Sequence, residues 1–153
     1  MNVFTLSPYE IINAWKNLRN DLSKNKEQTL QEKLLRVNNF WWNCPFVNYS
    51  INFEKPEEWP TPWELIFENQ YDHVARSYMI AETLLLSEIC DLDKNSVELI
   101  LIKDIWDNSF KVVVKANNYI LGYENKNIVD YDQFLREKHT IILSYKKNNN
   151  IWQ

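Results

Sequence analysis

The hydrophobic positions in the first third of the chain repeat with the period of an α-helix. The first stripe consists of Ile11, Trp15, Leu18 and Leu22, spaced by four, three and four residues, which places them on one helical face. A second stripe, over residues 27–42, consists of Leu30, Leu34, Val37 and Trp41. A short polar turn, residues 23–26, separates the two. The pattern therefore predicts an antiparallel helical hairpin over residues 1–45.

Two start signals for helices have the same design. Ser7 precedes a proline and is followed three residues later by Glu10, the arrangement of a capping box with proline in the first turn. Thr61, Pro62 and Glu64 repeat it. We expect a short helix at 62–68 and a longer one at 72–87, both within residues 62–87. The longer one is apolar on most sides, which is typical of a central helix.

From residue 96 the period changes to the alternation of β-strands. Residues 97–102 alternate, residues 110–115 and 119–123 are rich in β-branched and aromatic side chains around a short connection, and 139–145 reads as a last strand. The predicted fold is α+β: the helical hairpin and the central helix pack on an antiparallel sheet of three to five strands within residues 96–146. Residues 147–153 are predicted to be a polar, mobile tail.

The chain has a single glycine, Gly122. Asparagine is expected to replace glycine where the backbone is left-handed, at Asn38 and Asn39, at Asn117 and Asn118, and in the run 148–150. Because no glycine-rich phosphate loop exists, nucleotide binding by the familiar loop motifs is excluded.

Aromatic residues gather in the segment between the helices. Residues 46–61 follow Pro45, contain two more of the five prolines, Pro56 and Pro60, and form a predicted extended loop. Aromatic side chains in such a loop either wrap the core or contact a partner, because tyrosine and tryptophan dominate both environments. Both interpretations stay open, and the candidate interaction residues in or beside loops are Tyr49, Phe53, Trp59, Trp63 and Trp152.

Composition limits the class of protein. The chain has 153 residues, 45% of them hydrophobic, which suits one domain, residues 1–153. Its net charge of −4 disfavours nucleic acid as a partner. No apolar run is long enough to span a membrane and no basic segment leads into an apolar one near the start. We expect no membrane partner and no cofactor.

Catalytic groups are few. Cys44 follows a helix end and Cys90 is next to an aspartate, and both settings oppose a thiolate. His73 follows Asp72, but neighbours on a helix do not face each other, and the carboxylate is better explained as a helix cap. His139 begins a strand and has no evident catalytic partner.

Metal ligands are also missing from the pattern. Neither histidine nor cysteine occurs in pairs with ligand spacing. Asp91, Asp93 and Asn95 alternate like the start of a calcium loop, but the glycine and the glutamate that complete such a loop are absent. No metal site is predicted.

The order of these elements resembles the transglutaminase-like branch of the papain-like fold. The resemblance rests on residues 71–75 at the start of the central helix, followed by the strands at 97–103, 110–115 and 119–123. In that family a cysteine opens the helix, a histidine opens a following strand, and an acidic or amide residue lies on the next. Those positions fall near Asp72, near Ser109, and near Gly122 or Glu124. The resemblance therefore implies the fold without its catalytic groups.

Residues 59–66 and 81–86 are also similar to small uncharacterised proteins of large tailed bacteriophages. The two resemblances imply a non-catalytic structural or assembly component of a phage particle, first in the host cytoplasm and then in the virion. Its partners would be other phage structural proteins or a host protein, and oligomeric assembly is possible. The alternatives are a cysteine-dependent transglutaminase-like or protease-like enzyme, with Cys44 and either His73 or His139, and a regulator that binds a host protein.

Overall fold

The computed structural model describes residues 2–153. Five α-helices pack on a five-stranded antiparallel sheet, and a small two-stranded sheet lies beside them, which confirms the predicted α+β class. The helices are α1 (Pro8–Lys24), α2 (Leu30–Trp42), α3 (Pro62–Glu68), α4 (His73–Leu86) and α5 (Tyr131–Arg136). Short 3-10 turns lie at Val3–Thr5, Pro56–Glu58 and Lys94–Ser96.

The main sheet has the order β4-β3-β2-β1-β5, and every neighbouring pair is antiparallel. Its strands are β1 (Glu98–Asp104), β2 (Phe110–Ala116), β3 (Tyr119–Glu124), β4 (Asn127–Asp130) and β5 (His139–Tyr145). The predicted hairpin between β2 and β3 is present, and Asn117 has the left-handed backbone expected of it, with φ of 50°.

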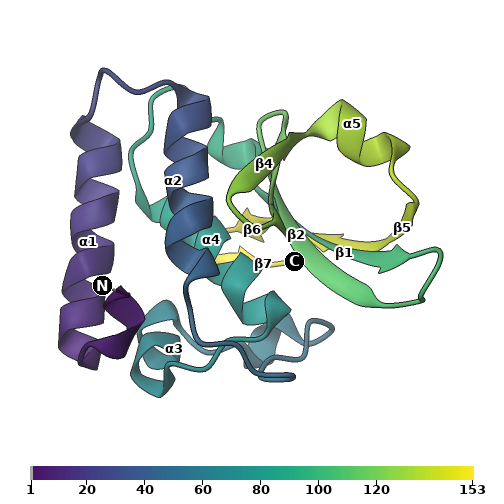
Figure 1. Cartoon of the computed structure of the whole chain (residues 1–153), viewed down its shortest axis with the longest axis horizontal. Helices are drawn as coiled ribbons and strands as arrows, with labels where there is room; N and C mark the ends of the chain where they lie inside the picture. Colours follow the sequence, from purple (N-terminus) through teal and green to yellow (C-terminus); the bar gives the residue numbers. More distant parts are fainter. Residues whose placement is uncertain (1) are drawn as a thin grey trace.

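Helix α4 is central. It lies between the α1–α2 hairpin and the sheet, while α5 lies on the other side of the sheet (Figure 1). Ten of its side chains are buried, which explains its nearly uniform apolar sequence. Thr83 on α4 accepts hydrogen bonds from the indole nitrogens of Trp15 at 2.8 Å and Trp41 at 2.9 Å. The hairpin is thus fixed to α4 by polar as well as apolar contacts.

The predicted helix starts are formed by their caps. Ser7 with Glu10 makes a complete capping box, and the Thr61 side chain accepts a hydrogen bond from the Glu64 backbone at 3.2 Å. A further box, Thr29 with Glu32, starts α2 at Leu30 rather than at the predicted residue 27. Residues before Thr29 belong to the turn because the box fixes the first helical residue.

Two predictions of local structure are wrong. Asn38 and Asn39 lie inside α2, and Asn38 is fully buried instead of forming a turn. Residues 147–153 form a hairpin, β6 (Lys147–Asn148) with β7 (Ile151–Trp152), in place of the predicted polar tail. The reason is Trp152, which is 7% exposed and anchors the end of the chain.

The proline-containing loop is held by main-chain contacts as well as by aromatic side chains. Val47 donates to the carbonyl of Tyr71 at 2.9 Å, and Tyr71 donates to that of Pro45 at 3.0 Å. The loop is therefore attached to the residues that precede α4, and from there it runs to Trp59 and Trp63.

Candidate functional site

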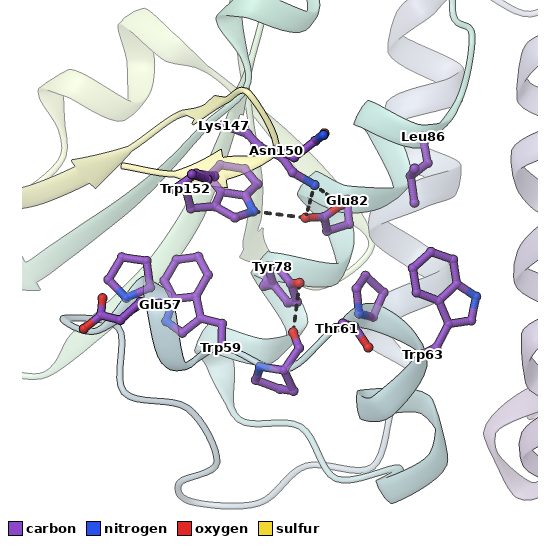
Figure 2. Close-up of a pocket in the computed structure, with 14 residues that line it drawn as sticks. Glu57, Trp59, Thr61, Trp63, Tyr78, Glu82, Leu86, Lys147, Asn150 and Trp152 are labelled. Atoms are coloured by element: carbon purple, nitrogen blue, oxygen red, sulfur yellow. Dashed lines mark hydrogen bonds and ion pairs between the residues drawn. The ribbon is translucent and has the colours of Figure 1, made fainter.

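A pocket of about 590 Å³ lies beside the second half of α4. Its walls come from the loop before α3, from the first turn of α3, from α4 and from the β6–β7 hairpin. Trp59 and Trp152 lie on one side, Trp63 and Leu86 on the other, and Tyr78 and Glu82 lie between them (Figure 2). Segments distant in sequence thus form one aromatic concavity.

The polar end of the pocket is a closed network around Glu82. This carboxylate is 2% exposed. It accepts hydrogen bonds from Lys147 Nζ at 2.9 and 3.0 Å and from Trp152 Nε1 at 3.0 Å (Figure 2). Because a buried charge is tolerated only when it is paired and hydrogen-bonded, Glu82 explains why the chain end folds back onto α4.

The tryptophan faces are supported from behind. Phe53 stacks on Trp59 with ring centroids 5.6 Å apart, and Trp59 contacts Tyr78 at 5.5 Å and Trp152 at 6.2 Å. Trp59 Nε1 donates to the Asn52 carbonyl at 2.9 Å. These contacts fix the rings in place before any ligand arrives, which lowers the entropy cost of binding.

Tyr78 donates its hydroxyl hydrogen to the Pro60 carbonyl at 2.9 Å. Burial raises the pKa of Tyr78 above its usual range, and the nearby carboxylates of Glu82 and Glu64 raise it further. The phenol therefore remains a neutral donor that ties the loop to α4.

Three of the five aromatic residues predicted from the sequence come together here. Trp59, Trp63 and Trp152 all line the pocket. Phe53 is 5% exposed and supports Trp59 rather than presenting a contact surface. Tyr49 is 71% exposed and is absent from the pocket lining.

The start of α4 is the position to which the family resemblance assigns a nucleophile. Asp72 occupies it as the predicted helix cap, with Ala75 donating to Oδ1 at 2.8 Å. Its Oδ2 accepts from the backbone of Ser50 at 2.8 Å and of Ile51 at 3.1 Å. The carboxylate therefore joins the loop to the helix, and all of these contacts are structural.

Cationic side chains surround the next turn of α4. The guanidinium of Arg76 lies 3.7 Å from the ring centroid of Trp42, and Lys111 Nζ lies 5.6 Å from the same centroid. Lys111 also donates to the Tyr123 carbonyl. Burial, together with the charge of Arg76, lowers the pKa of Lys111 to about 8, although the carboxylate of Glu124 opposes the shift.

His73 completes this group. Its Nδ1 accepts a hydrogen bond from the Val112 backbone at 3.1 Å, so the ring is neutral with its proton on Nε2. Burial lowers the pKa of His73, and Arg76 and Lys111 lower it further, although Asp72 opposes the shift. We name His73, Arg76 and Lys111 the cationic cluster.

Neither cysteine is placed for acyl transfer. Cys44 is 8% exposed, and burial raises its pKa to about 12 despite the nearby charge of Arg76. Cys90 is exposed, and its sulfur lies 3.8 Å from the carboxylate of Asp91. Within residues 2–153 no hydrogen bond joins either sulfur to His73 or His139.

The other two positions assigned by the resemblance differ from each other. Ser109 is exposed in the turn before β2, where its hydroxyl donates to Asp107 at 2.6 Å. Gly122 is buried against α4 with φ of 75°, and an added Cβ would lie 2.8 Å from Ser77 Oγ. Gly122 is therefore required by the close approach of β3 to α4.

The residues missed from the sequence are Glu82 and Lys147 in the pocket, and Arg76 and Lys111 in the cationic cluster. Glu82 had a signal: it is the one carboxylate in a helix that is otherwise apolar or uncharged after Arg76. A charge in such a place needs a partner. No comparable signal in the sequence points to Lys111, because a single lysine at the start of a strand is common.

Residues 2–153 contain neither a metal-binding cluster nor a membrane-spanning helix. No group of three or more histidine, cysteine or acidic side chains is placed to hold a metal ion. No described helix is both long and apolar enough to cross a membrane.

Comparison with known protein families found no match. Comparison with curated proteins also found none. Solved structures of LapG from Legionella pneumophila are similar. One has a TM-score of 0.68 and 18% identity, covering 91% of this chain and 75% of that one. A calcium-bound form has a TM-score of 0.66 and 17% identity, covering 96% and 87%. At this identity the similarity concerns the fold alone, and it supports the transglutaminase-like fold inferred from the order of elements.

Proposed function

We propose that this protein is a non-catalytic interaction domain on a transglutaminase-like fold, and that it binds an extended segment of a partner protein in the tryptophan pocket. The observation that carries the proposal is the convergence of Trp59, Trp63 and Trp152 on one concavity. Aromatic side chains that line a preformed pocket are the usual anchors of protein interfaces.

The exposed walls favour an apolar anchor residue in the partner. Trp63 is 44% exposed, Leu86 39% and Ile151 61%, so a bound side chain would remove several apolar surfaces from water at once. The polar groups of Glu82, Tyr78 and Trp59 already have hydrogen-bond partners within the chain. These three side chains therefore need no polar group from a ligand.

Charge around the pocket favours basic residues beside that anchor. Residues 54–68, which contain two of the three tryptophans, carry five glutamates and one lysine. Glu57 lines the pocket and is exposed. An acidic rim attracts a basic segment and repels an acidic one. The partner segment is thus an extended peptide with an aliphatic or aromatic anchor flanked by lysine or arginine.

The absence of a usable nucleophile supports the non-catalytic part of the proposal. Asp72 is committed to three backbone donors, and the thiol of Cys44 is buried with a raised pKa. A thiol must ionise and be reached by substrate to act as a nucleophile. A thiol-directed reagent at neutral pH is expected to modify Cys90 and to leave Cys44 unreacted in the folded protein. Rapid modification of Cys44 would revive the enzyme hypothesis.

The binding experiment uses a blocked peptide with a central phenylalanine flanked by lysines, titrated calorimetrically. Trp63→Ala is expected to weaken binding by about tenfold or more, as for an anchor in an interface pocket. The matched control is Trp106→Ala, because Trp106 is 73% exposed and absent from the pocket lining. A second peptide with glutamate in place of lysine should bind more weakly. Equal binding by wild type and Trp63→Ala would refute the pocket as the site.

The phage origin of the partner stays a prediction. The comparisons with known proteins give no support to a role in a phage particle. Density-gradient sedimentation of particles tests it: a protein that never sediments with particles or assembly intermediates is not one of their components.

A further inference from the structure

We propose that the cationic cluster of His73, Arg76 and Lys111 is a binding site for a phosphate group, separate from the tryptophan pocket. The site is built by the first turn of α4 and the start of β2. It does not depend on the proposed function, because none of its three residues lines that pocket.

Arg76 and Lys111 carry positive charges that no carboxylate of the described chain pairs with. Residues 2–153 contain four ion pairs, and neither Arg76 nor Lys111 belongs to any of them. The two cations nevertheless lie within 6 Å of one indole ring, that of Trp42. Two like charges held together in a half-buried place repel each other. An anion that contacts both cations would relieve that repulsion.

Arg76 also has unused hydrogen-bonding capacity. Its guanidinium stacks on Trp42 and lies 5.4 Å from the centroid of Phe46. Stacking fixes the plane of the guanidinium but leaves its in-plane N–H groups unsatisfied. Its Nε is buried and has no hydrogen-bond partner in the described chain. The described residues thus supply no acceptor to this guanidinium, and its terminal amino groups, which are not among the buried unpaired atoms, are the donors that a ligand can reach.

His73 adds a directed neutral donor. It precedes Arg76 by three residues, so the two side chains share a face of α4. Because Val112 donates to its Nδ1, the remaining proton is on Nε2 and can be donated to a ligand. The ring is fixed by a backbone contact, so little ordering is needed on binding.

The charge of the cluster selects the class of anion. Arg76 and Lys111 together carry two positive charges with His73 neutral, while a phosphate monoester carries a charge between about −1.5 and −2 at neutral pH. A carboxylate would compensate half of the cluster. Three acids are close. Asp72 is occupied by backbone donors, and Asp104, which lines a cavity with Lys111, accepts from the backbone of its own turn. Glu124 is exposed, and neither it nor Asp104 is within ion-pair distance of Lys111. A phosphate group therefore matches the site better than a single carboxylate.

Nuclear magnetic resonance titration tests the proposal, with inorganic phosphate in one arm and N-acetyl phosphoserine amide in the other. The ring signals of His73 and the indole N–H of Trp42 should shift in a saturable way, and the pKa of His73 should rise. A response to phosphoserine at lower concentration than to inorganic phosphate would identify the ester as the ligand. The opposite order would identify free phosphate. No saturable shift with either probe would overturn the site.

Variants localise the binding. Arg76→Met and Lys111→Met should each weaken it by about tenfold or more, the effect of losing one charge-assisted hydrogen bond. Arg19→Met is the matched control, because Arg19 also stacks on a tryptophan, 4.2 Å from the centroid of Trp15, and also has a buried Nε without a partner. It has no cationic neighbour that shifts its pKa. Retained affinity in the Arg76→Met, Lys111→Met double variant would overturn the proposal.

Discussion

Helix α4 carries a carboxylate near its C-terminal end and a cation near its N-terminal end, and only the carboxylate has an oppositely charged partner within residues 2–153. Glu82 is 2% exposed and is neutralised by Lys147 with a further bond from Trp152. Arg76 is half-buried, has no carboxylate partner within residues 2–153, and lies near a second cation. The paired charge holds a chain segment in place. The unpaired charge leaves interaction capacity for something outside the chain.

A buried charge with all its partners inside the fold destabilises strongly when one partner is removed, because the other partner is then left buried and uncompensated. A cation without a partner contributes little to folding, so its removal costs little. Substitutions at the two ends of α4 should therefore differ in their effect on the free energy of unfolding.

Glu82→Ala should have the largest effect. It leaves the ammonium of Lys147 and the indole N–H of Trp152 without an acceptor, so we expect the free energy of unfolding to fall by about 2–4 kcal/mol, measured by urea denaturation. Glu88→Ala is the matched control, because its pair with Lys94 is exposed and should contribute less than about 1 kcal/mol. Equal losses in the two variants would contradict a structural role for Glu82.

A double variant separates charge from packing at this end. Glu82→Leu with Lys147→Met removes both charges and keeps apolar volume, so it should recover part of the stability lost by Glu82→Ala. If the double variant is less stable than the single one, then the ion pair itself, rather than the cost of an orphaned partner, stabilises the hairpin.

Gly122→Ala should have the next largest effect. The residue has φ of 75°, and a new Cβ would approach Ser77 Oγ to 2.8 Å, so we expect a loss of about 1–3 kcal/mol in the same assay. Combining it with Ser77→Ala removes the contact but not the backbone strain. A full recovery in the double variant would show that only the contact matters, and no loss in the single variant would refute the need for glycine.

The features that could be predicted from the sequence depend on residues close together in the chain. Ser7, Thr61 and Asp72 cap the helices they were expected to cap, because capping depends on residues three positions apart. The failures depend on distant contacts. Asn38 was expected in a turn, but its side chain accepts from Gly122 N at 2.7 Å and donates to the Glu124 carbonyl at 3.1 Å. Those partners are more than eighty residues away.

In the candidate site, too, local features were predictable and long-range contacts were not. Its aromatic members, including Trp59 and Trp63, were identified from residue type and loop position alone. Their convergence was not, because it requires Trp152 to bond to Glu82, seventy residues earlier in the chain. Strand β4 was missed for a related reason: it has four residues and pairs irregularly with β3, so no period could reveal it.

The cationic end of α4 should respond to pH through Lys111. Its pKa is about 8 in the folded protein, below its usual value of 10.5, so between these values the unfolded chain binds a proton that the folded one does not. Stability from this group is therefore lower below pH 8 and rises as pH increases through the window. After allowance for solvent screening of this half-buried group, the change is on the order of 1 kcal/mol.

Comparison with Lys111→Met isolates that contribution. Cys44 has a raised pKa and acts in the opposite direction, because the unfolded chain loses that proton first, but it is present in both proteins. The difference in unfolding free energy between wild type and Lys111→Met, followed from pH 7.5 to 9.5, should shift in favour of wild type. A difference that does not change with pH would mean that Lys111 is not desolvated.

Arg76→Met should have the smallest effect on stability, and it is the sharpest contrast with Glu82→Ala. The substitution removes the cation–π contact with Trp42, worth about 0.5–1 kcal/mol at a partly exposed site, but methionine keeps most of the stem that packs there. It also removes the repulsion of Lys111, whose pKa should rise. Because these terms oppose each other, we expect the free energy of unfolding to change by less than about 1 kcal/mol. Urea denaturation at pH 7 measures this, and Arg36→Met, which breaks the 2.6 Å pair with Asp21, provides a comparison with a paired arginine. A loss as large as that of Glu82→Ala would mean that Arg76 is needed for folding. Its lack of a carboxylate partner would then no longer support a ligand site at this end of α4.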